Sequence, residues 1–503
     1  MEGDREALAK ALEAGTGQTK QGEMIMEWST YQQAVFDAVE HTVDNLAVIA
    51  RAGSGKTTTI LEAIKRVPRT RKTRVVLTAF NRSIAEEMQR RLGASGEAKT
   101  LHQLGLGILK SAGHARIIND EKGFDIAMRL TNDDKRKAAK VKRAAAYLKN
   151  MYVHDATAAV EALDDFDFEP WFNSLEEVID LALKAMALAL SESRSIDFDD
   201  MVWLPVRLGL RAEYPPHVVF VDEAQDLNPT QLGLITKCMG DARIVMVADP
   251  RQAIYGFRGA DEEVFRNILG HLETKELPLS ITYRCATSIV DEVRKFVPDL
   301  EAAPGAPVGV VRHMDRGEGL NEVREGDFVI SRTNRGAVNA CLALAHRGIK
   351  TNILGRSLGE TLQGMIRKSK ATNINELSAW VQTWQSKQVA KCEEKDQDPG
   401  PFLDRAGCLL GLIREAKEVH EVEKKLRDLF IDNRPEDVAL CSTVHRIKGL
   451  ERDRVFMLRD TFLQPWGKRV PGEVKAPSRE EENLYYVACT RAKRELVMLD
   501  GEW

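Results

Sequence analysis

The sequence predicts an α/β fold, with parallel strands buried between helices, and two stretches of the chain carry this prediction. Residues 45–50, NLAVIA, are a short apolar run typical of a buried parallel strand. After a glycine-containing loop, TTTILEAIKRV (57–67) has apolar side chains at helical spacing. One face of that helix would consist of Ile60, Ala63, Ile64 and Val67. Further along, YPPHVVFVDEAQD (214–226) predicts a β-branched strand with acidic residues at its carboxyl end, where ligands bind in open α/β sheets.

The loop between the first strand and its helix, ARAGSGKTTT (50–59), matches the phosphate-binding pattern G-x-x-x-x-G-K-[ST], with Ala50 in place of the first glycine. In such a loop, backbone N–H groups surround phosphate oxygens, the lysine adds charge at the β- and γ-phosphates, and the next hydroxyl binds Mg²⁺. Thr57 is therefore a predicted Mg²⁺ ligand. The residues expected to hold the nucleotide are Ala52, Gly53, Ser54, Gly55, Lys56, Thr57 and Thr58.

Asp222 and Glu223 directly follow the predicted strand VVFV. This position predicts that Asp222 holds Mg²⁺ through its water shell and that Glu223 orients the water that attacks the γ-phosphate. A solvated turn is the alternative for an isolated Asp-Glu pair. The buried strand before the pair and the phosphate loop upstream favour a nucleoside triphosphatase, with Lys56 and these two acids as catalytic residues.

Length, charge and cysteine content exclude several other classes of protein. A chain of 503 residues is long enough for about three or four domains. Its net charge of −4 provides no overall basic field, so a nucleic-acid site must be a local groove. The seven cysteines are scattered without a C-x-x-C pair, which argues against a zinc or iron–sulfur site and predicts reduced thiols in the cytoplasm. No apolar run approaches the roughly 18 residues of a membrane span, and the charged residues 1–27 are expected to form a flexible extension.

Further motifs follow the acidic pair in a fixed order: VADPRQAIYGFRGA (247–260), LSITYRC (279–285), STVHRIKGLERDRVF (442–456) and EENLYYVACTRAKREL (481–496). With these stretches the chain resembles the UvrD/Rep-like superfamily 1A DNA helicases, whose motifs run in the same order. STYQQAVFDAV (29–39) is similar to the adenine-reading glutamine motif of that family. Three more stretches resemble its DNA-facing elements: LTAFNRSIAEEM (77–88), TLHQLG (100–105) and IDFDDMVWLP (196–205). The resemblance implies two RecA-like motor domains that bind ATP and Mg²⁺ in the cleft between them.

The resemblance also implies roles around the base and the ribose. Gln32, whose side-chain amide offers a donor and an acceptor, would pair with adenine, and Tyr283 would stack on the adenine ring. Glu451 resembles the residue that binds the ribose, and Gly449 in the same segment allows close backbone approach. A surface position is the alternative for Gln32. Thr58 stands where relatives often carry an arginine against the adenine, so base selectivity is expected to be looser.

Three residues would act at the γ-phosphate. Gln252 resembles the glutamine that senses this phosphate and couples it to strand position. Arg284 and Arg491 resemble the arginines that reach it from the second motor domain, a role that suits a planar and permanently charged guanidinium. Because arginines are more often surface residues, these two assignments depend on the motifs around them, TYRC for Arg284 and VACTRA for Arg491.

A translocating motor holds a single strand by stacking and backbone contacts rather than by reading base edges. The residues that match DNA contacts of the family are Phe80, Asn81, His102, Tyr255, Phe257, Arg258, Thr443 and His445. Core packing is the alternative for Phe80 and Phe257. The basic stretch KRKAAKVKR (135–143) is either a phosphate-binding face or a solvated helix face.

The motifs fall into two groups, which predicts two RecA-like domains, each with a mainly helical insertion. The expected parts are a flexible extension (1–27), a first motor domain (28–107 and 194–280) with its insertion (108–193), and a second motor domain (281–359 and 437–503) with its insertion (360–436). DQDPGP (396–401) predicts a loop inside the second insertion. This insertion is shorter than its counterpart in the larger relatives, which implies weak unwinding by an isolated monomer.

The expected function is an ATP-dependent single-stranded DNA translocase and 3′-to-5′ DNA helicase that acts at single/double-strand junctions. The alternative is a DNA-stimulated regulatory ATPase, a subunit of a nuclease, repair or defence complex that unwinds little without its protein partner. An inactive nucleic-acid-binding protein is disfavoured by the intact catalytic motifs. No membrane is expected as a partner.

Overall fold

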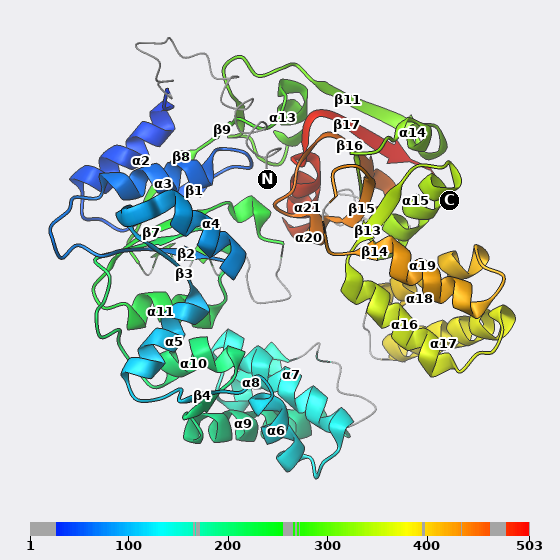
Figure 1. The fold of residues 1–503 in the computed structure, drawn as a ribbon, viewed down its shortest axis with the longest axis horizontal. Helices are drawn as coiled ribbons and strands as arrows, with labels where there is room; N and C mark the ends of the chain where they lie inside the picture. The colour runs from blue at the N-terminus through cyan, green and yellow to red at the C-terminus, as the bar shows by residue number, and fades with distance from the viewer. Residues whose placement is uncertain are drawn as a thin grey trace.

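The computed structural model describes residues 27–163, 166, 172–254, 265–266, 269–270, 272–394, 398–433, 435–462 and 479–501. Within these residues, two parallel sheets form the centres of two lobes that lie side by side (Figure 1). The predicted N-terminal extension lies almost entirely outside the described residues. Three predicted DNA contacts, Tyr255, Phe257 and Arg258, also lie outside them.

The first lobe is built on a six-stranded sheet in the order β3-β2-β6-β7-β1-β8, with every neighbouring pair parallel. Its strands are β1 (Leu46–Ala50), β2 (Val75–Ala79), β3 (Glu97–Thr100), β6 (Val218–Val221), β7 (Arg243–Ala248) and β8 (Lys275–Leu279). The two predicted strands are β1 and β6, and both occupy interior positions because their apolar side chains are covered on both faces of the sheet.

Helices cover both faces of the first sheet. They are α2 (Thr30–His41), α3 (Lys56–Arg66), α4 (Arg82–Leu92), α5 (Leu101–Ser111), α10 (Phe198–Arg207) and α11 (Pro229–Cys238). The apolar face predicted for the helix after the loop is confirmed, since Ile60, Ala63, Ile64 and Val67 are all buried. Short 3₁₀ turns, η1 (Gly93–Ser95), η2 (Ala224–Asp226) and η3 (Pro250–Gln252), also belong to this lobe.

The second lobe is built on a seven-stranded parallel sheet in the order β11-β17-β16-β12-β15-β13-β14. Its strands are β11 (Val310–Asp315), β12 (Phe328–Ser331), β13 (Thr351–Leu354), β14 (Phe430–Ile431), β15 (Ala439–Thr443), β16 (Arg452–Leu458) and β17 (Ala492–Asp500). The helices against it are α13 (Thr287–Val293), α14 (Arg316–Glu322), α15 (Asn334–His346), α20 (Val444–Ile447) and α21 (Arg479–Cys489), with the turn η5 (Arg459–Thr461). Two parallel sheets flanked by helices confirm the predicted α/β class.

Both segments predicted as insertions are mainly helical. The first contains α6 (Lys122–Leu130), α7 (Lys135–Met151), α8 (Ala156–Ala162) and α9 (Leu175–Ser191) around a buried core that they share with α5 and α10. The second contains α16 (Arg356–Ser369), α17 (Ile374–Glu394), α18 (Gly400–Arg414) and α19 (Val419–Leu429). Two small parallel pairs, β4 (Ile117–Ile118) with β5 (Ser195–Ile196) and β9 (Ile281–Thr282) with β10 (Glu301–Ala302), complete the described elements.

The loop predicted at 396–401 is shorter than expected, because α18 already begins at Gly400. Pro401 occupies the first turn of this helix, where a missing backbone N–H leaves no hydrogen bond unmade. The seven cysteines are all buried with free thiols. In the part of the chain that the structure describes, no helix has both the length and the hydrophobicity to cross a bilayer.

Candidate nucleotide site and nucleic-acid interface

The predicted phosphate loop joins the carboxyl end of β1 to the N-terminus of α3. Gly53 and Gly55 have φ angles of +74° and +75°, which a residue with a Cβ rarely adopts. A Cβ on Gly53 would also lie 2.5 Å from Cβ of Arg284, so the loop passes directly against the second lobe. The hydroxyl of Ser54 is buried and has no hydrogen-bond partner among the described residues. A glycine-shaped loop with an unsatisfied buried polar atom fits a site that receives phosphate oxygens.

Lys56, Asp222 and Glu223 lie together at the carboxyl ends of β1 and β6. Nζ of Lys56 donates to both carboxylate oxygens of Glu223 at 2.9 Å. Burial and then the neighbouring Glu223 raise the pKa of Asp222 to about 7. Burial alone would also raise the pKa of Glu223, but Lys56 and Lys448 outweigh it and keep this carboxylate ionised. Two partly exposed carboxylates beside a hydroxyl-bearing loop are oxygen ligands of the kind that Mg²⁺ prefers, so the predicted ligands Thr57 and Asp222 fit that ion.

A chain of hydrogen bonds connects Glu223 to Gln252. The Gln225 side chain donates to Glu223 at 2.5 Å and accepts the backbone N–H of Asp249 at 3.0 Å. Gln252 in turn donates to the carboxylate of Asp249 at 2.7 Å. Sequence reasoning missed Gln225 and Asp249, although both stand inside the motifs VDEAQD and VADPRQ. The chain of contacts physically joins the predicted base to the predicted γ-phosphate sensor.

Two residues of the second lobe contact this network directly, and neither was predicted from the sequence. The Tyr486 hydroxyl accepts the backbone N–H of Ala52 at 2.8 Å and donates to Asp249 at 3.1 Å. Lys448 donates to both carboxylate oxygens of Asp226, at 2.7 and 2.8 Å, and to the carbonyl oxygen of Gln252 at 2.8 Å. Both residues lie within the motifs STVHRIKGLERDRVF and EENLYYVACTRAKREL. No local sequence pattern predicts that their side chains contact the other lobe.

Arg51 is a further cross-lobe contact that begins inside the phosphate loop. Its guanidinium donates twice to Asp299, at 2.8 and 2.9 Å, and once to Asp249 at 3.4 Å. Ala52 and Ile254 also pack into the apolar cluster of the second lobe. The loop is therefore held between the two sheets, as a cleft between two motor domains requires.

The predicted second-lobe residues are only partly brought to the loop. Tyr283 donates its backbone N–H to the carbonyl oxygen of Gly53 at 2.8 Å, while its side chain is 51% exposed beside the loop. Arg284 forms an ion pair with Glu451, which also pairs with Lys493 at 3.1 Å. An exposed ring at this position is suited to stacking on a base.

The hydrogen bonds of the Arg491 side chain lie within the second lobe. Arg491 is 1% exposed, and its guanidinium donates to the carbonyl oxygens of Val487 at 2.9 Å and Leu450 at 3.1 Å. Burial and then the charge of Arg284 lower the pKa of Arg491 to about 10. These bonds and one to the hydroxyl of Thr490 use three of the five guanidinium N–H groups, so the contact with the γ-phosphate stays a prediction. Gly449, in the adjoining segment, has a φ of +86°, which fits its predicted role in close backbone approach.

Gln32 is buried, at 5% exposure, so it is not a surface glutamine. Its side-chain oxygen accepts the backbone N–H of Ser29 at 3.0 Å, and its amide nitrogen donates to the hydroxyl of Thr59 at 3.1 Å. A carboxamide has two acceptor and two donor positions, so one of each remains for an adenine edge. The helix cap at Ser29 thus orients the side chain toward the loop.

The predicted DNA contacts of the first lobe follow the strands next to the nucleotide site. Phe80 and Asn81 come directly after β2, and His102 lies in α5 after β3, at the same carboxyl edge of the sheet as the phosphate loop. Phe80 is 60% exposed, so it does not belong to the core. Asn81 caps α4 by accepting the backbone N–H of Ile84 at 2.9 Å.

A second exposed aromatic residue lies beside His102. The ring of Phe198, the first residue of α10, stacks on His102 with centroids 3.7 Å apart and an interplanar angle of 18°. Phe198 is 57% exposed, and sequence reasoning did not single it out within IDFDDMVWLP. An exposed phenylalanine resting on a neutral imidazole offers a flat surface for a nucleic-acid base.

Two of the predicted DNA contacts lie in the second lobe, at the carboxyl end of β15. Thr443 is buried at the end of this strand, and His445 follows in α20. Burial, and next the charge of Arg332, lower the pKa of His445 to about 4. In the first insertion, the predicted basic face at 135–143 is partly used internally, because Lys137 lies 3.9 Å from the Glu177 carboxylate.

The free energy of unfolding is expected to fall as the pH is lowered from about 6.5 toward 4. Burial lowers the pKa of His102 to about 4 from 6.5, so in this range the unfolded chain binds a proton that the folded chain does not. Urea unfolding at neutral and at mildly acidic pH measures this loss. A His102→Leu variant has no titrating ring there and should lose less stability, so identical pH dependence in both proteins would contradict the assignment.

Two parallel sheets with a phosphate loop, an adjacent acidic pair and a cross-lobe network define a P-loop nucleotide-binding protein of the two-motor-domain type. Residues 31–272 match the UvrD/REP helicase N-terminal domain, and residues 330–500 match the UvrD-like helicase C-terminal domain. The chain belongs to the UvrD/Rep-like helicase family.

Similar proteins include F-box DNA helicase protein 1 of Schizosaccharomyces pombe, with 26% identity over 90% of this chain and 55% of that protein. DNA helicase II of Escherichia coli is 24% identical over 64% of this chain and 49% of its own length. ATP-dependent DNA helicase Rep of Escherichia coli is 30% identical over 44% of this chain and 36% of its own length. The chain spans about half the length of the first two relatives.

Proposed function

We propose that this chain is an ATP-dependent single-stranded DNA translocase and 3′-to-5′ DNA helicase. The observation that carries the proposal is the position of the phosphate loop, which contacts Arg284 and Tyr486 of the second lobe while Lys56 meets Glu223 of the first. A nucleotide bound there lies between two sheets that can move against each other. The relatives named as DNA helicases support DNA as the substrate.

Within the site, each side chain has a defined task during hydrolysis. Lys56 leaves Glu223 to hold the β- and γ-phosphates, which frees the Glu223 carboxylate to orient and deprotonate the attacking water. Thr57 and Asp222 would hold Mg²⁺, which neutralises charge on the phosphate oxygens. Gln252 contacts the γ-phosphate, and its hydrogen bond to Asp249 connects that contact to Tyr486 of the second lobe. Arg284 leaves its ion pair with Glu451 and pairs with the γ-phosphate instead, where it stabilises charge on the transferred group.

We also propose the division of the chain that the motifs predict. The first motor domain comprises residues 28–107 and 194–280, with an insertion at 108–193. The second comprises 281–359 and 437–503, with an insertion at 360–436. The contact of Lys448 with Asp226 and Gln252 lies across this division, and it would break and reform as the domains open and close.

The polarity of movement is tested by strand displacement on duplexes with a 3′ or a 5′ single-stranded tail. The proposed 3′-to-5′ movement requires displacement from 3′-tailed substrates only, and equal use of both tails would contradict it. Because the second insertion is short, single-turnover unwinding by limiting protein should be weak and should improve in protein excess. Strong unwinding of long duplexes that does not depend on protein concentration would show that the short insertion suffices.

The alternative function is a DNA-stimulated regulatory ATPase whose unwinding depends on a nuclease, repair or other protein partner. It shares the same nucleotide site and the same DNA path. ATP hydrolysis stimulated by single-stranded DNA, without displacement from either tail at any protein concentration, would favour this alternative.

Phe198→Ala is expected to raise the concentration of single-stranded DNA needed for half-maximal ATPase activity by about 5- to 150-fold, because stacking contributes roughly 1–3 kcal/mol per base. The titration should be run beside Tyr214→Ala, which removes an exposed aromatic side chain that precedes β6, at the opposite edge of the same sheet. Only the first variant should change the titration. An unchanged midpoint for Phe198→Ala would remove this residue from the DNA path.

A further inference from the structure

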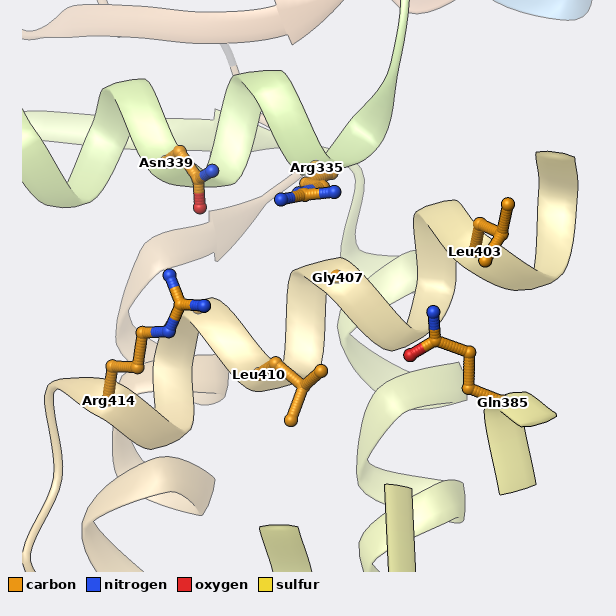
Figure 2. A pocket seen from close by; sticks show the side chains of 8 residues that line it. Arg335, Asn339, Gln385, Leu403, Gly407, Leu410 and Arg414 are labelled. Carbon is orange, nitrogen blue, oxygen red and sulfur yellow. The ribbon is translucent and has the colours of Figure 1, made fainter. Parts of the chain in front are cut away.

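A cavity that carries two arginines lies away from the nucleotide site, between α15, which packs on the second sheet, and the insertion helices α17 and α18. Its volume is 240 Å³, well above the roughly 10–15 Å³ that one water molecule needs. The lining residues that matter for its chemistry are Arg335, Asn339, Gln385, Gly407, Gly411 and Arg414. Figure 2 shows Arg335 and Asn339 on the side of α15 that faces α18, with Arg414 pointing toward Asn339 from the end of α18.

Two glycines on α18 make room for the polar side chains of α15 at the cavity. Gly407 and Gly411 are four residues apart and therefore lie on the same face of the helix, toward α15. A Cβ on Gly407 would lie 2.4 Å from Cδ of Arg335, and one on Gly411 would lie 2.8 Å from Oδ1 of Asn339. Larger residues at these two positions would displace the polar side chains of α15.

Both arginines of the cavity lack an ion-pair partner among the described residues, although carboxylates are close in sequence. Asp404 is directed to the N-terminus of α15, where it accepts the backbone N–H of Arg335 at 2.7 Å. Glu415, next to Arg414, pairs with His346 at 2.5 Å. The described lining contains no carboxylate. Two solvent-exposed guanidinium groups thus lie at one cavity whose described lining supplies no anion.

We propose that this cavity binds a phosphate group, supplied either by a free sugar phosphate or nucleotide or by the backbone of DNA. Two guanidinium groups form strong, charge-assisted hydrogen bonds to phosphate oxygens. A tetrahedral phosphate presents oxygens in several directions and can meet Arg335 on α15 and Arg414 on α18 at the same time. Asn339 and Gln385 add neutral amide donors. A bound phosphate would tie the helical insertion to the second sheet.

The test uses the full chain with Lys56→Ala, which silences the phosphate loop, and titrates inorganic phosphate by calorimetry. Saturable binding is expected, with affinity about tenfold or more weaker after Arg335→Gln or Arg414→Gln, because each change removes a hydrogen bond between charged groups. Arg427→Gln is the matched control, since Arg427 on α19 is exposed like Arg335 and Arg414 but does not line the cavity. Thermal unfolding of each variant verifies that it is folded.

Two further ligands separate the sources of the phosphate. A small phosphate ester is identified if two results occur together. Ribose 5-phosphate competes with inorganic phosphate, and the arginine changes leave oligothymidylate binding unaffected. The DNA backbone is identified if the slope of log affinity against log salt for oligothymidylate falls by about 0.7 for each arginine removed. Equal phosphate binding by all folded variants, an equal loss in Arg427→Gln, or acetate binding as strong as phosphate binding would overturn the proposal. None of these outcomes depends on helicase activity.

Discussion

Lys56→Ala is expected to lower the rate of ATP hydrolysis by about a thousandfold or more, because the charge that stabilises the transferred phosphate is lost. In the structure Nζ of Lys56 lies 2.9 Å from both oxygens of Glu223, at the carboxyl ends of β1 and β6. The same substitution leaves the Glu223 carboxylate without its nearest cation. Both effects act on hydrolysis, and the steady-state rate at saturating single-stranded DNA measures them together.

Lys65→Ala is the matched control for this substitution. Lys65 lies on the same helix, α3, but its Nζ pairs with Glu62 at 3.3 Å on the exposed side. Surface ion pairs of this kind contribute little, so the control should hydrolyse ATP at nearly the parent rate. Hydrolysis by Lys56→Ala at the rate of the control would show that the loop does not bind the reacting phosphates.

Glu223→Gln is expected to bind ATP but to hydrolyse it about a hundred to ten thousand times more slowly, because an amide cannot accept the proton of the attacking water. The substitution keeps the size of the side chain, and Gln225 remains beside it to form a hydrogen bond. Binding of a fluorescent ATP analogue and DNA-stimulated hydrolysis should be measured on the same preparation. Hydrolysis at the parent rate would assign the base to another residue, whereas loss of binding would make Glu223 a structural partner of Lys56.

The two substitutions also separate nucleotide binding from hydrolysis. Lys56 and Glu223 form one ion pair, and either change removes that pairing of charges. Lys56→Ala should weaken nucleotide binding as well as hydrolysis, whereas Glu223→Gln should retain binding. A common loss of both properties in the two variants would indicate that the ion pair itself shapes the site.

Much of the first lobe could be predicted from the sequence because its signals are local. The run NLAVIA forms β1, the loop places Lys56 at the start of α3, and VVFV forms β6 with Asp222 at its end. Each of these features depends on a few neighbouring residues. Runs of apolar residues predict strands, apolar residues at helical spacing predict helices, and glycines supply the positive φ angles of the loop. Parallel strands then bring their carboxyl ends to one edge, so the acidic pair and the loop meet.

Other parts of the site depend on contacts that no local pattern records. The sequence suggested roles for Gln252 and Arg284, but it did not indicate that Gln225 and Asp249 connect Glu223 to Gln252. It also did not indicate that Arg284 pairs with Glu451, or that the donors of Arg491 are directed to backbone carbonyl groups. Side-chain hydrogen bonds are decided by which partners reach one another after the helices and strands have packed.

The sequence by itself therefore determined the α/β class, the phosphate loop, the acidic pair and the family of this protein. Only the tertiary structure decided how the lobes meet, as in the contact of Lys448 with Asp226, which are 222 positions apart. It also decided that Phe198 stacks on His102 and that Arg335 and Arg414 face one cavity. The physical reason is range: turns, strands and helices form from neighbouring residues, whereas these pairs meet only after whole sheets and helices have packed against one another.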